Sequence, residues 1–129
     1  MVILIRKAIP KDASQLNKLD IVANKEKPWW EVQSVSEFRK SVKFIFVAES
    51  TEEIIGYAQL KKDNKKFWLE NIYVLKNYRK KQIAKKLVNC LLKEIKPKYV
   101  SLITSDENLR IFEKLGFKKT MNYMVKVIK

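Results

Sequence analysis

Histidine is absent from the 129-residue chain, and Cys90 is its only cysteine. Without histidine the protein has no Ser–His or Cys–His pair for covalent catalysis, and no zinc site with a histidine ligand. A single cysteine forms no disulfide within the chain, which fits a reducing compartment. We therefore expect no metal site, and any chemistry has to use carboxylates, hydroxyls, backbone N–H groups or a bound cofactor.

Glycine and proline are also scarce, with two and three residues respectively. This composition leaves no room for a flexible linker, and the chain length is that of one domain. The longest apolar runs, Met1–Ile5 and Phe44–Ala48, are five residues each, which is far too short to cross a membrane. Arg6 and Lys7 follow the first run instead of preceding it, unlike a secretory signal. The sequence thus predicts a single soluble, cytoplasmic domain over residues 1–129, with no membrane partner and an open oligomeric state.

Positive charge dominates the composition, with 28 lysine and arginine residues against 14 acidic ones and a net charge of +14. Such an excess favours polyanionic partners, namely nucleic acid, acidic protein surfaces or phosphorylated ligands. The alternative is a lysine-rich solvated surface without a specific partner. Because the lysines occur along the whole chain, their distribution favours the second interpretation.

The apolar patterns predict a mixed α/β domain. Segments rich in β-branched and aromatic residues indicate strands at Val2–Lys7, Phe44–Glu49, Ile54–Leu60, Phe67–Val74, Tyr99–Thr104 and Tyr123–Ile128. Helices are expected after a cap at Asp12, after a cap at Ser34 or Ser36, and over Lys81–Lys96 and Asp106–Leu115. This order describes an antiparallel meander that enters a β-α-β unit.

The segment after Val74 concentrates positive charge at the start of a predicted helix. Between Glu70 and Glu94 there is no acidic residue, and the cations are Lys76, Arg79, Lys80, Lys81, Lys85, Lys86 and Lys93. A helix N-terminus already carries partial positive charge and unpaired N–H groups, so acidic residues are usual there. The stacked cations favour a bound anion at this helix start, and phosphate is the usual one. A chance arrangement in a lysine-rich chain is the alternative.

Residues 70–87 read ENIYVLKNYRKKQIAKKL, in which Arg79, Gln82 and Ala84 follow a predicted strand and open a predicted helix. This spacing resembles the cofactor-binding motif of the GNAT N-acetyltransferase superfamily, which is Arg or Gln, two residues, Gly, one residue, then Gly or Ala. The segments similar to other parts of that family are Ile5–Ala13, Ile54–Ala58 and Phe112–Phe117. The resemblance implies an α/β fold with a mixed, mostly antiparallel central sheet, about four flanking helices and a splay at the cofactor-binding strand.

The resemblance also implies that acetyl-CoA binds at this junction as the acetyl donor. The strand backbone expected to pair with its pantetheine arm is that of Ile72, Tyr73 and Val74. The pyrophosphate is expected at the following turn and helix start, on Arg79, Lys80, Lys81, Gln82, Ile83, Ala84 and Lys85. A backbone N–H near Tyr73 or Val74 would face the thioester oxygen and stabilise the oxyanion. Asn108 is a further candidate cofactor contact.

Glu70 is the candidate general base, because the family often places such a residue at this strand position, acting through water. A carboxylate needs desolvation to accept a proton near neutral pH. The alternative is a solvent-facing or cation-paired strand residue. An amine that attacks the thioester directly needs no covalent enzyme nucleophile, and the acceptor is left open among a protein N-terminus, a lysine side chain and a small amine.

Two positions depart from the family pattern. Gln82 replaces the first glycine, which lets the backbone approach the pyrophosphate closely. Glutamine is expected to keep helical angles and turn its side chain aside, or to donate its own hydrogen bond to phosphate. Phe112 stands where relatives often carry a tyrosine as general acid. These departures favour the alternative function, a non-catalytic GNAT-like module that binds CoA, nucleic acid or an acidic protein, whereas Glu70 and the intact spacing favour the enzyme.

Trp29 and Trp30 lie in the break between the first two predicted helices, a region that borders the acceptor site in the family. The neighbouring Glu26 and Glu31 could draw in a cationic amine. The alternative is that the two tryptophans pack in the core or within the loop.

Overall fold

A computed structural model describes residues 2–102, 109–120 and 123–127. Within these residues the strands form one sheet in the order β1-β2-β3-β4-β5-β7-β6. The strands are β1 (Leu4–Lys7), β2 (Ile45–Ser50), β3 (Glu53–Asp63), β4 (Lys66–Val74), β5 (Tyr99–Leu102), β6 (Lys118–Thr120) and β7 (Tyr123–Val127). The β4–β5 pair is parallel and the other described pairs are antiparallel.

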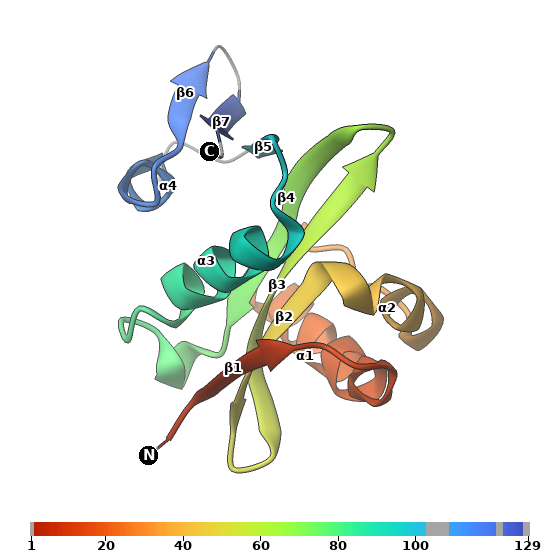
Figure 1. Cartoon of the computed structure of the whole chain (residues 1–129). Coiled ribbons are helices and arrows are strands. Elements are labelled where there is room, and N and C mark those ends of the chain that lie inside the picture. The colour runs from red at the N-terminus through yellow and green to blue at the C-terminus, as the bar shows by residue number, and fades with distance from the viewer. Residues whose placement is uncertain (1, 103–108, 121–122, 128–129) are drawn as a thin grey trace.

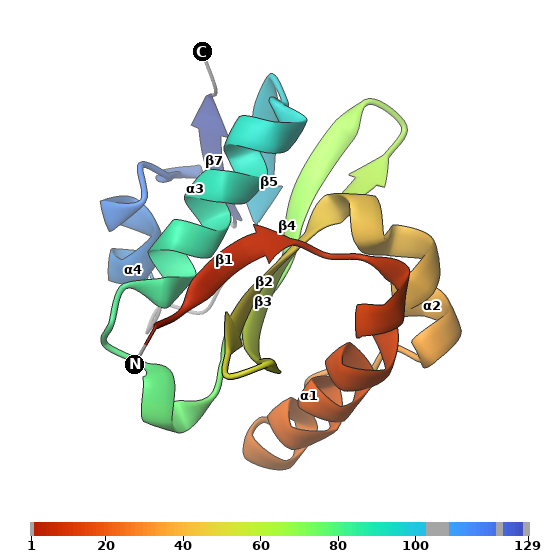
Figure 2. The same ribbon diagram turned by 60° about the horizontal axis from the view of Figure 1, so that its bottom comes forward.

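The α-helices in the described residues are α1 (Ala13–Glu26), α2 (Val35–Ser41), α3 (Ile83–Ile95) and α4 (Leu109–Lys114). Short 3₁₀ turns occupy Pro10–Asp12, Val42–Phe44 and Lys76–Tyr78. The helices α1 and α2 cover one face of the sheet and α3 covers the other (Figures 1 and 2). The expected mixed, mostly antiparallel sheet with about four helices is confirmed.

The expected elements are found with small differences at their ends. The short strand β6 was not predicted, because three residues are too few to show an alternating pattern. The helix α3 begins at Ile83 instead of Lys81, after a turn with left-handed backbone angles. The predicted first residues of the helix from Asp106 lie outside the described residues, as does Asn108.

The two apolar cores lie on opposite faces of the sheet. On one face, α3 buries the stripe that its sequence predicts, which consists of Ile83, Leu87, Val88, Leu91 and Leu92. On the other face, the buried side chains of α1 and α2 pack against Tyr57 of β3 and Tyr73 of β4. The site described below lies where β4 passes between these two cores.

The strand β4 diverges from its parallel neighbour. Its register with β5 covers Phe67↔Val100 and Trp68↔Ser101, whereas its register with β3 extends to the last residue, Val74. In the described part of the chain, the second half of β4 therefore lacks a strand partner on its β5 side. This is the splay expected at the cofactor-binding strand.

A β-bulge at Glu70 changes which face each β4 side chain occupies. Gln59 of β3 is opposite Asn71 and Leu60 is opposite Leu69, so Glu70 is the extra residue. Without the bulge, Leu69 and Tyr73 would share a face, because side chains alternate along a strand. With it, Leu69 packs in the α3 core and Tyr73 packs in the α1 core.

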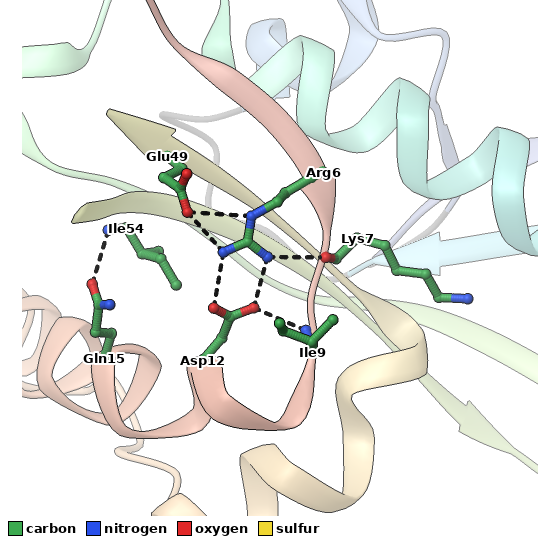
Figure 3. Close-up of polar contacts among 7 residues, drawn as sticks. All are labelled: Arg6, Lys7, Ile9, Asp12, Gln15, Glu49 and Ile54. Atoms are coloured by element: carbon green, nitrogen blue, oxygen red, sulfur yellow. Dashed lines mark hydrogen bonds and ion pairs between the residues drawn. The ribbon is translucent and has the colours of Figure 1, made fainter. Parts of the chain in front are cut away.

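Arg6 of β1 joins the start of α1 to β2 (Figure 3). Its guanidinium donates to both carboxylate oxygens of Asp12 at 2.8 and 2.9 Å and to Glu49 Oε1 at 2.8 Å. Asp12 also accepts from the Ile9 N–H at 2.8 Å, and it makes no capping hydrogen bond to α1. Asp12 is thus the N-cap residue of α1, as expected, but its side chain does not cap the helix N–H groups, because Arg6 and Ile9 use the carboxylate.

The pKa of Asp12 reports this arrangement. Burial by itself would raise that pKa, but the hydrogen bonds from Arg6 and the Ile9 N–H outweigh burial and hold the pKa below its ordinary 3.8. The Asp12 side chain is only 4% exposed. Loss of its charge would leave the guanidinium of Arg6 with a single carboxylate partner.

We expect Asp12→Asn to lower the free energy of unfolding at pH 7 by about 1–3 kcal/mol, because it removes a charge-assisted pair from a buried position. Lys7→Ala is the matched control. Its ammonium contacts Glu94 at 3.3 Å with both side chains 47% exposed, so the expected change is within about 0.5 kcal/mol. Urea denaturation at pH 7 measures both values, and equal effects for the two variants would contradict a special role for Asp12.

Candidate functional site

A cavity of about 530 Å³ lies where the chain passes from β4 into α3. Its lining residues are Val74, Tyr78, Arg79, Lys80, Gln82, Ile83, Ala84, Lys85, Lys114 and Leu115. The volume is in the range of small-molecule and cofactor sites. Most of the residues expected to hold the pyrophosphate thus share one cavity. Ile72, Tyr73 and Lys81 are not among its lining residues.

The turn before α3 has an unusual backbone. Lys80 has a φ of 68° and Gln82 a φ of 59°, both in the left-handed region. The expectation that Gln82 keeps right-handed helical angles is therefore wrong: Gln82 adopts the conformation for which glycine is the usual residue. The chain makes its turn at Gln82, and the first right-handed helical residue is Ile83.

The start of α3 offers backbone donors to an anion. The first turn of this helix contains no acidic residue, and the Gln82 side chain makes no capping hydrogen bond to any described residue. The first N–H groups of an α-helix have no partner within the helix. With the exposed Lys80 and Lys85 beside them, these groups form a site with the charge and the donors that phosphate requires.

Arg79, in the turn before α3, forms an ion pair with Glu26 at the end of α1. Its guanidinium donates to both oxygens of Glu26 at the end of α1, each at 2.6 Å, and its Nε donates to the Val74 carbonyl at 2.8 Å. The hydrogen bonds from Arg79, together with that from Tyr73, lower the pKa of Glu26 to about 2. Glu26 lies 53 residues before Arg79, so the acid-free window around Arg79 gave no sign of this partner.

Tyr73 links the same carboxylate to the sheet. Its hydroxyl donates to Glu26 Oε1 at 2.7 Å, and its ring packs edge-on against Trp30 with centroids 5.5 Å apart. Burial and then the hydrogen bond to Glu26 raise the pKa of Tyr73 to about 12. The cofactor strand, the cofactor turn and the end of α1 therefore meet at one carboxylate.

Glu70 lies in a second cavity, of about 420 Å³. This cavity is lined by Glu31, Gln33, Glu37, Lys40, Ser41, Phe44, Gln59, Leu60, Lys61, Lys62, Glu70 and Asn71. The Glu70 side chain is exposed, so the described residues do not supply the desolvation that a general base needs near neutral pH.

The lining of this second cavity includes three amide side chains, those of Gln33, Gln59 and Asn71. Gln59 Oε1 accepts from Gln33 Nε2 at 2.8 Å and from Asn71 Nδ2 at 3.4 Å. The Gln33 N–H in turn donates to the fully buried Asp20 at 2.9 Å. These residues were not predicted, because single amide side chains in a loop and in two strands form no recognisable sequence motif.

Phe112 packs edge-on against Phe117, with ring centroids 6.0 Å apart. Its side chain is half-buried, and its ring has no acidic proton to donate to a leaving thiolate.

Within the described residues there is no group of three acidic or cysteine side chains arranged to hold a metal ion. No helix formed by these residues is both long and apolar enough to span a membrane.

The sequence profile of a family described as "Acetyltransferase (GNAT) domain" matches residues 41–119, which is more than half of the chain. The chain belongs to the GNAT acetyltransferase family. This is a family of acetyl-CoA-dependent N-acetyltransferases, and the family resemblance inferred from residues 70–87 is confirmed. No curated protein matches the sequence.

Solved structures share the GNAT fold at low sequence identity. N-acetylglutamate synthase from Neisseria gonorrhoeae, with coenzyme A and N-acetyl-glutamate, has a TM-score of 0.84 at 12% identity. This match covers 100% of the present chain but 36% of that one. The PaiA N-acetyltransferase from Thermoplasma acidophilum, with coenzyme A, has a TM-score of 0.77 at 20% identity and covers 98% and 99% of the two chains.

A GNAT family acetyltransferase from Brucella melitensis in complex with acetyl-CoA has a TM-score of 0.79 at 18% identity. The match covers 99% of the present chain and 89% of that one. At such identities the structures establish the shared fold and leave the acceptor open.

We expect Gln82→Gly to raise the free energy of unfolding by up to about 1 kcal/mol, because glycine adopts left-handed angles without the steric penalty that glutamine has there. Lys86→Gly, at an exposed position within α3, is the matched control and is expected to lower it by about 1 kcal/mol. Urea denaturation distinguishes the two signs. A loss at Gln82 as large as that at Lys86 would show that the turn does not need a left-handed residue.

The Glu26–Arg79 pair predicts a specific pH dependence of stability. The folded-state pKa of Glu26 is about 2 against an ordinary 4.5. A lowered pKa adds stability that is fully present above the unfolded-state pKa and is lost as the pH falls through the folded-state pKa. The difference in unfolding free energy between wild type and Glu26→Gln should therefore be largest above about pH 5 and shrink toward pH 2.

Arg79→Gln is the partner variant for this measurement, and it should remove the same pH dependence. Because both side chains are about one-third exposed, at 34% and 35%, salt should also reduce the difference. A difference between wild type and Glu26→Gln that stays constant from pH 6 to pH 2 would show that the pair does not form.

Proposed function

We propose that residues 1–129 act as one catalytic domain that transfers the acetyl group of acetyl-CoA to a primary amine by direct attack. The observation that carries this proposal is the second half of β4, which has no strand partner on its β5 side among the described residues and is followed, after a turn, by a helix start rich in donors and cations. An extended pantetheine arm can pair with the free backbone of a strand, and a pyrophosphate can bind at a helix N-terminus. Here the strand precedes the helix start, which matches the order of the pantetheine arm and the pyrophosphate in CoA.

The residues proposed for the cofactor divide into two groups. Ile72, Tyr73 and Val74 present strand backbone to the pantetheine arm, and the turn and first helical residues, Lys80 to Lys85, present N–H groups and ammonium groups to the pyrophosphate. Arg79 contributes by fixing the turn, since its guanidinium is held by Glu26 and by the Val74 carbonyl. A side chain at Asn108 remains a proposed cofactor contact.

The reaction needs a neutral amine and a base that accepts the proton that this amine loses. The amine nitrogen forms a bond to the thioester carbonyl carbon, the carbon–sulfur bond breaks, and CoA leaves as a thiolate that takes up a proton. We assign Glu70 as the base that receives the amine proton through water. Its position at the bulge supports this role, because the bulge directs Glu70 into the cavity beside β4.

Titration calorimetry with acetyl-CoA and with CoA, followed by a transfer assay on a panel of amines, tests the proposal. We expect micromolar or tighter binding of both. Glu70→Gln should lower kcat by about 100-fold and leave the affinity for acetyl-CoA unchanged. Glu53→Gln, at an exposed carboxylate that begins β3, is the matched control and should match wild type.

Two results would contradict the proposal. Unchanged turnover in Glu70→Gln removes this residue from the mechanism. Absence of binding by both acetyl-CoA and CoA at micromolar concentration would contradict the enzymatic function. A salt-dependent titration with nucleic acid would then test the alternative, a non-catalytic binding module.

A further inference from the structure

The ammonium of Lys27 sits among three aromatic rings. Its Nζ lies 5.9 Å from the ring centroid of Trp29, 5.7 Å from that of Trp30 and 5.8 Å from that of Tyr73. These distances are within the range of cation–π attraction, for which the limit is about 6 Å. Three rings around one cation form the arrangement by which proteins recognise alkylammonium ligands. We call these three rings the aromatic cage.

Polar contacts from α1 fix the loop that carries the cage. Trp30 is 7% exposed, and its Nε1 donates to the buried carboxylate of Asp20 at 3.1 Å. Asn24 Nδ2 donates to the Trp30 carbonyl at 2.8 Å. Trp29, whose ring centroid is 6.0 Å from that of Trp30, is 73% exposed and forms the rim. The inner wall is thus rigid and the outer wall is open to solvent.

The cage adjoins the strand expected to hold the thioester. Tyr73 supplies one ring of the cage and belongs to the open half of β4. A further cavity of about 450 Å³ lies beside it, and its lining includes Tyr73 and Glu26 together with Lys25 and Lys76. Glu26 also lies within Coulombic range of Lys27, whose charge contributes to its lowered pKa. A cation in the cage therefore has three rings near it and a carboxylate that is already paired with Arg79, whose guanidinium carbon lies 5.3 Å from the Tyr73 ring centroid.

Cation–π attraction favours the charged form of an amine. An amine that attacks a thioester has to be neutral, so the cage suits an ammonium that stays charged through the reaction. The separation along β4 supports the same division of roles. Tyr73 and Glu70 lie three residues apart on β4, so a flexible aliphatic chain with an amine at each end can extend along the strand from the cage toward Glu70.

We propose that the aromatic cage is the subsite for the second, non-reacting ammonium of an aliphatic diamine acceptor, and that Lys27 occupies it in the free protein as an internal competitor. This inference rests on the proposed acetyl transfer, in which the distal amine is the one that reacts. A substrate ammonium replaces that of Lys27 on the same three rings. The cavity with Glu70 is lined by the carboxylates of Glu31 and Glu37 and also by Lys40, Lys61 and Lys62, so groups of both charges line the space for the distal amine.

The binding test uses tetramethylammonium, which cannot be acetylated, with tryptophan fluorescence as the readout and acetyl-CoA left out. Lys27→Met removes the internal ammonium and keeps the length of the side chain. We expect it to bind the probe several-fold more tightly than wild type. Trp29→Ala in the same background should weaken binding by about 2- to 5-fold. Lys18→Met, at an exposed position of α1, is the control and should match wild type.

The kinetic test compares 1,5-diaminopentane with 1-aminopentane as acceptors. The diamine should have the higher kcat/KM, and Lys27→Met should lower its KM while kcat stays within twofold. The variant should leave the KM of the monoamine unchanged, which separates a vacated subsite from a general structural change. Trp29 is exposed, so the Trp29→Ala variant is expected to fold, and its thermal unfolding should coincide with that of wild type.

The proposal is overturned if Lys27→Met binds tetramethylammonium no more tightly than wild type, or if the diamine and the monoamine are equal substrates. Failure of the proposed function gives a different pattern. In that case acetyl-CoA does not bind in calorimetry while tetramethylammonium still does, which keeps the cage as a cation site and overturns its role in acceptor binding.

Discussion

The divergence of β4 from β5 is the constraint on which the remaining features of the site depend. Backbone N–H and C=O groups in a folded protein need hydrogen-bond partners. The strand β3 satisfies one side of β4 over its whole length, but β5 pairs with it only at Phe67 and Trp68 among the described residues. In the part of the chain that the structure describes, no strand pairs with the other side of Ile72 to Val74, where the Val74 carbonyl accepts a hydrogen bond from Arg79. The turn that follows Val74 leads to α3 at Ile83, where the first helical N–H groups are donors for phosphate.

One carboxylate connects the two halves of the site. Glu26 accepts hydrogen bonds from Arg79 in the cofactor turn and from Tyr73 in β4, and it ends the helix that leads into the aromatic cage. Arg79 is therefore neutralised within the protein, and the net positive charge around the helix start comes from the lysines. The bulge at Glu70 has a complementary effect. It turns Tyr73 and Asn71 toward α1 and α2, where the loop with Trp29 and Trp30 lies.

Most of the fold could be predicted from the sequence, because its helices and strands carry strong local patterns. The apolar face of α3 and the capping box of α2 at Ser34 and Glu37 are encoded by residues three or four positions apart. The bulge at Glu70 was not predictable in this way, because apolar residues on both sides of Glu70 hide the change of face. The left-handed backbone angles of Gln82 were not predicted, because glutamine is not typical of such a turn.

The sequence by itself determined the family resemblance, the order of most elements and the position of the cation-rich helix start. Each of these depends on residues that are close along the chain, where motifs and periodicity are visible. Only the tertiary structure decided that Arg79 pairs with Glu26, that Lys27 lies among Trp29, Trp30 and Tyr73, and that Arg6 joins Asp12 to Glu49. Half of these contacts join segments that are distant in sequence, and those between near neighbours depend on side-chain orientations that are set when α1 and its following loop pack against the sheet.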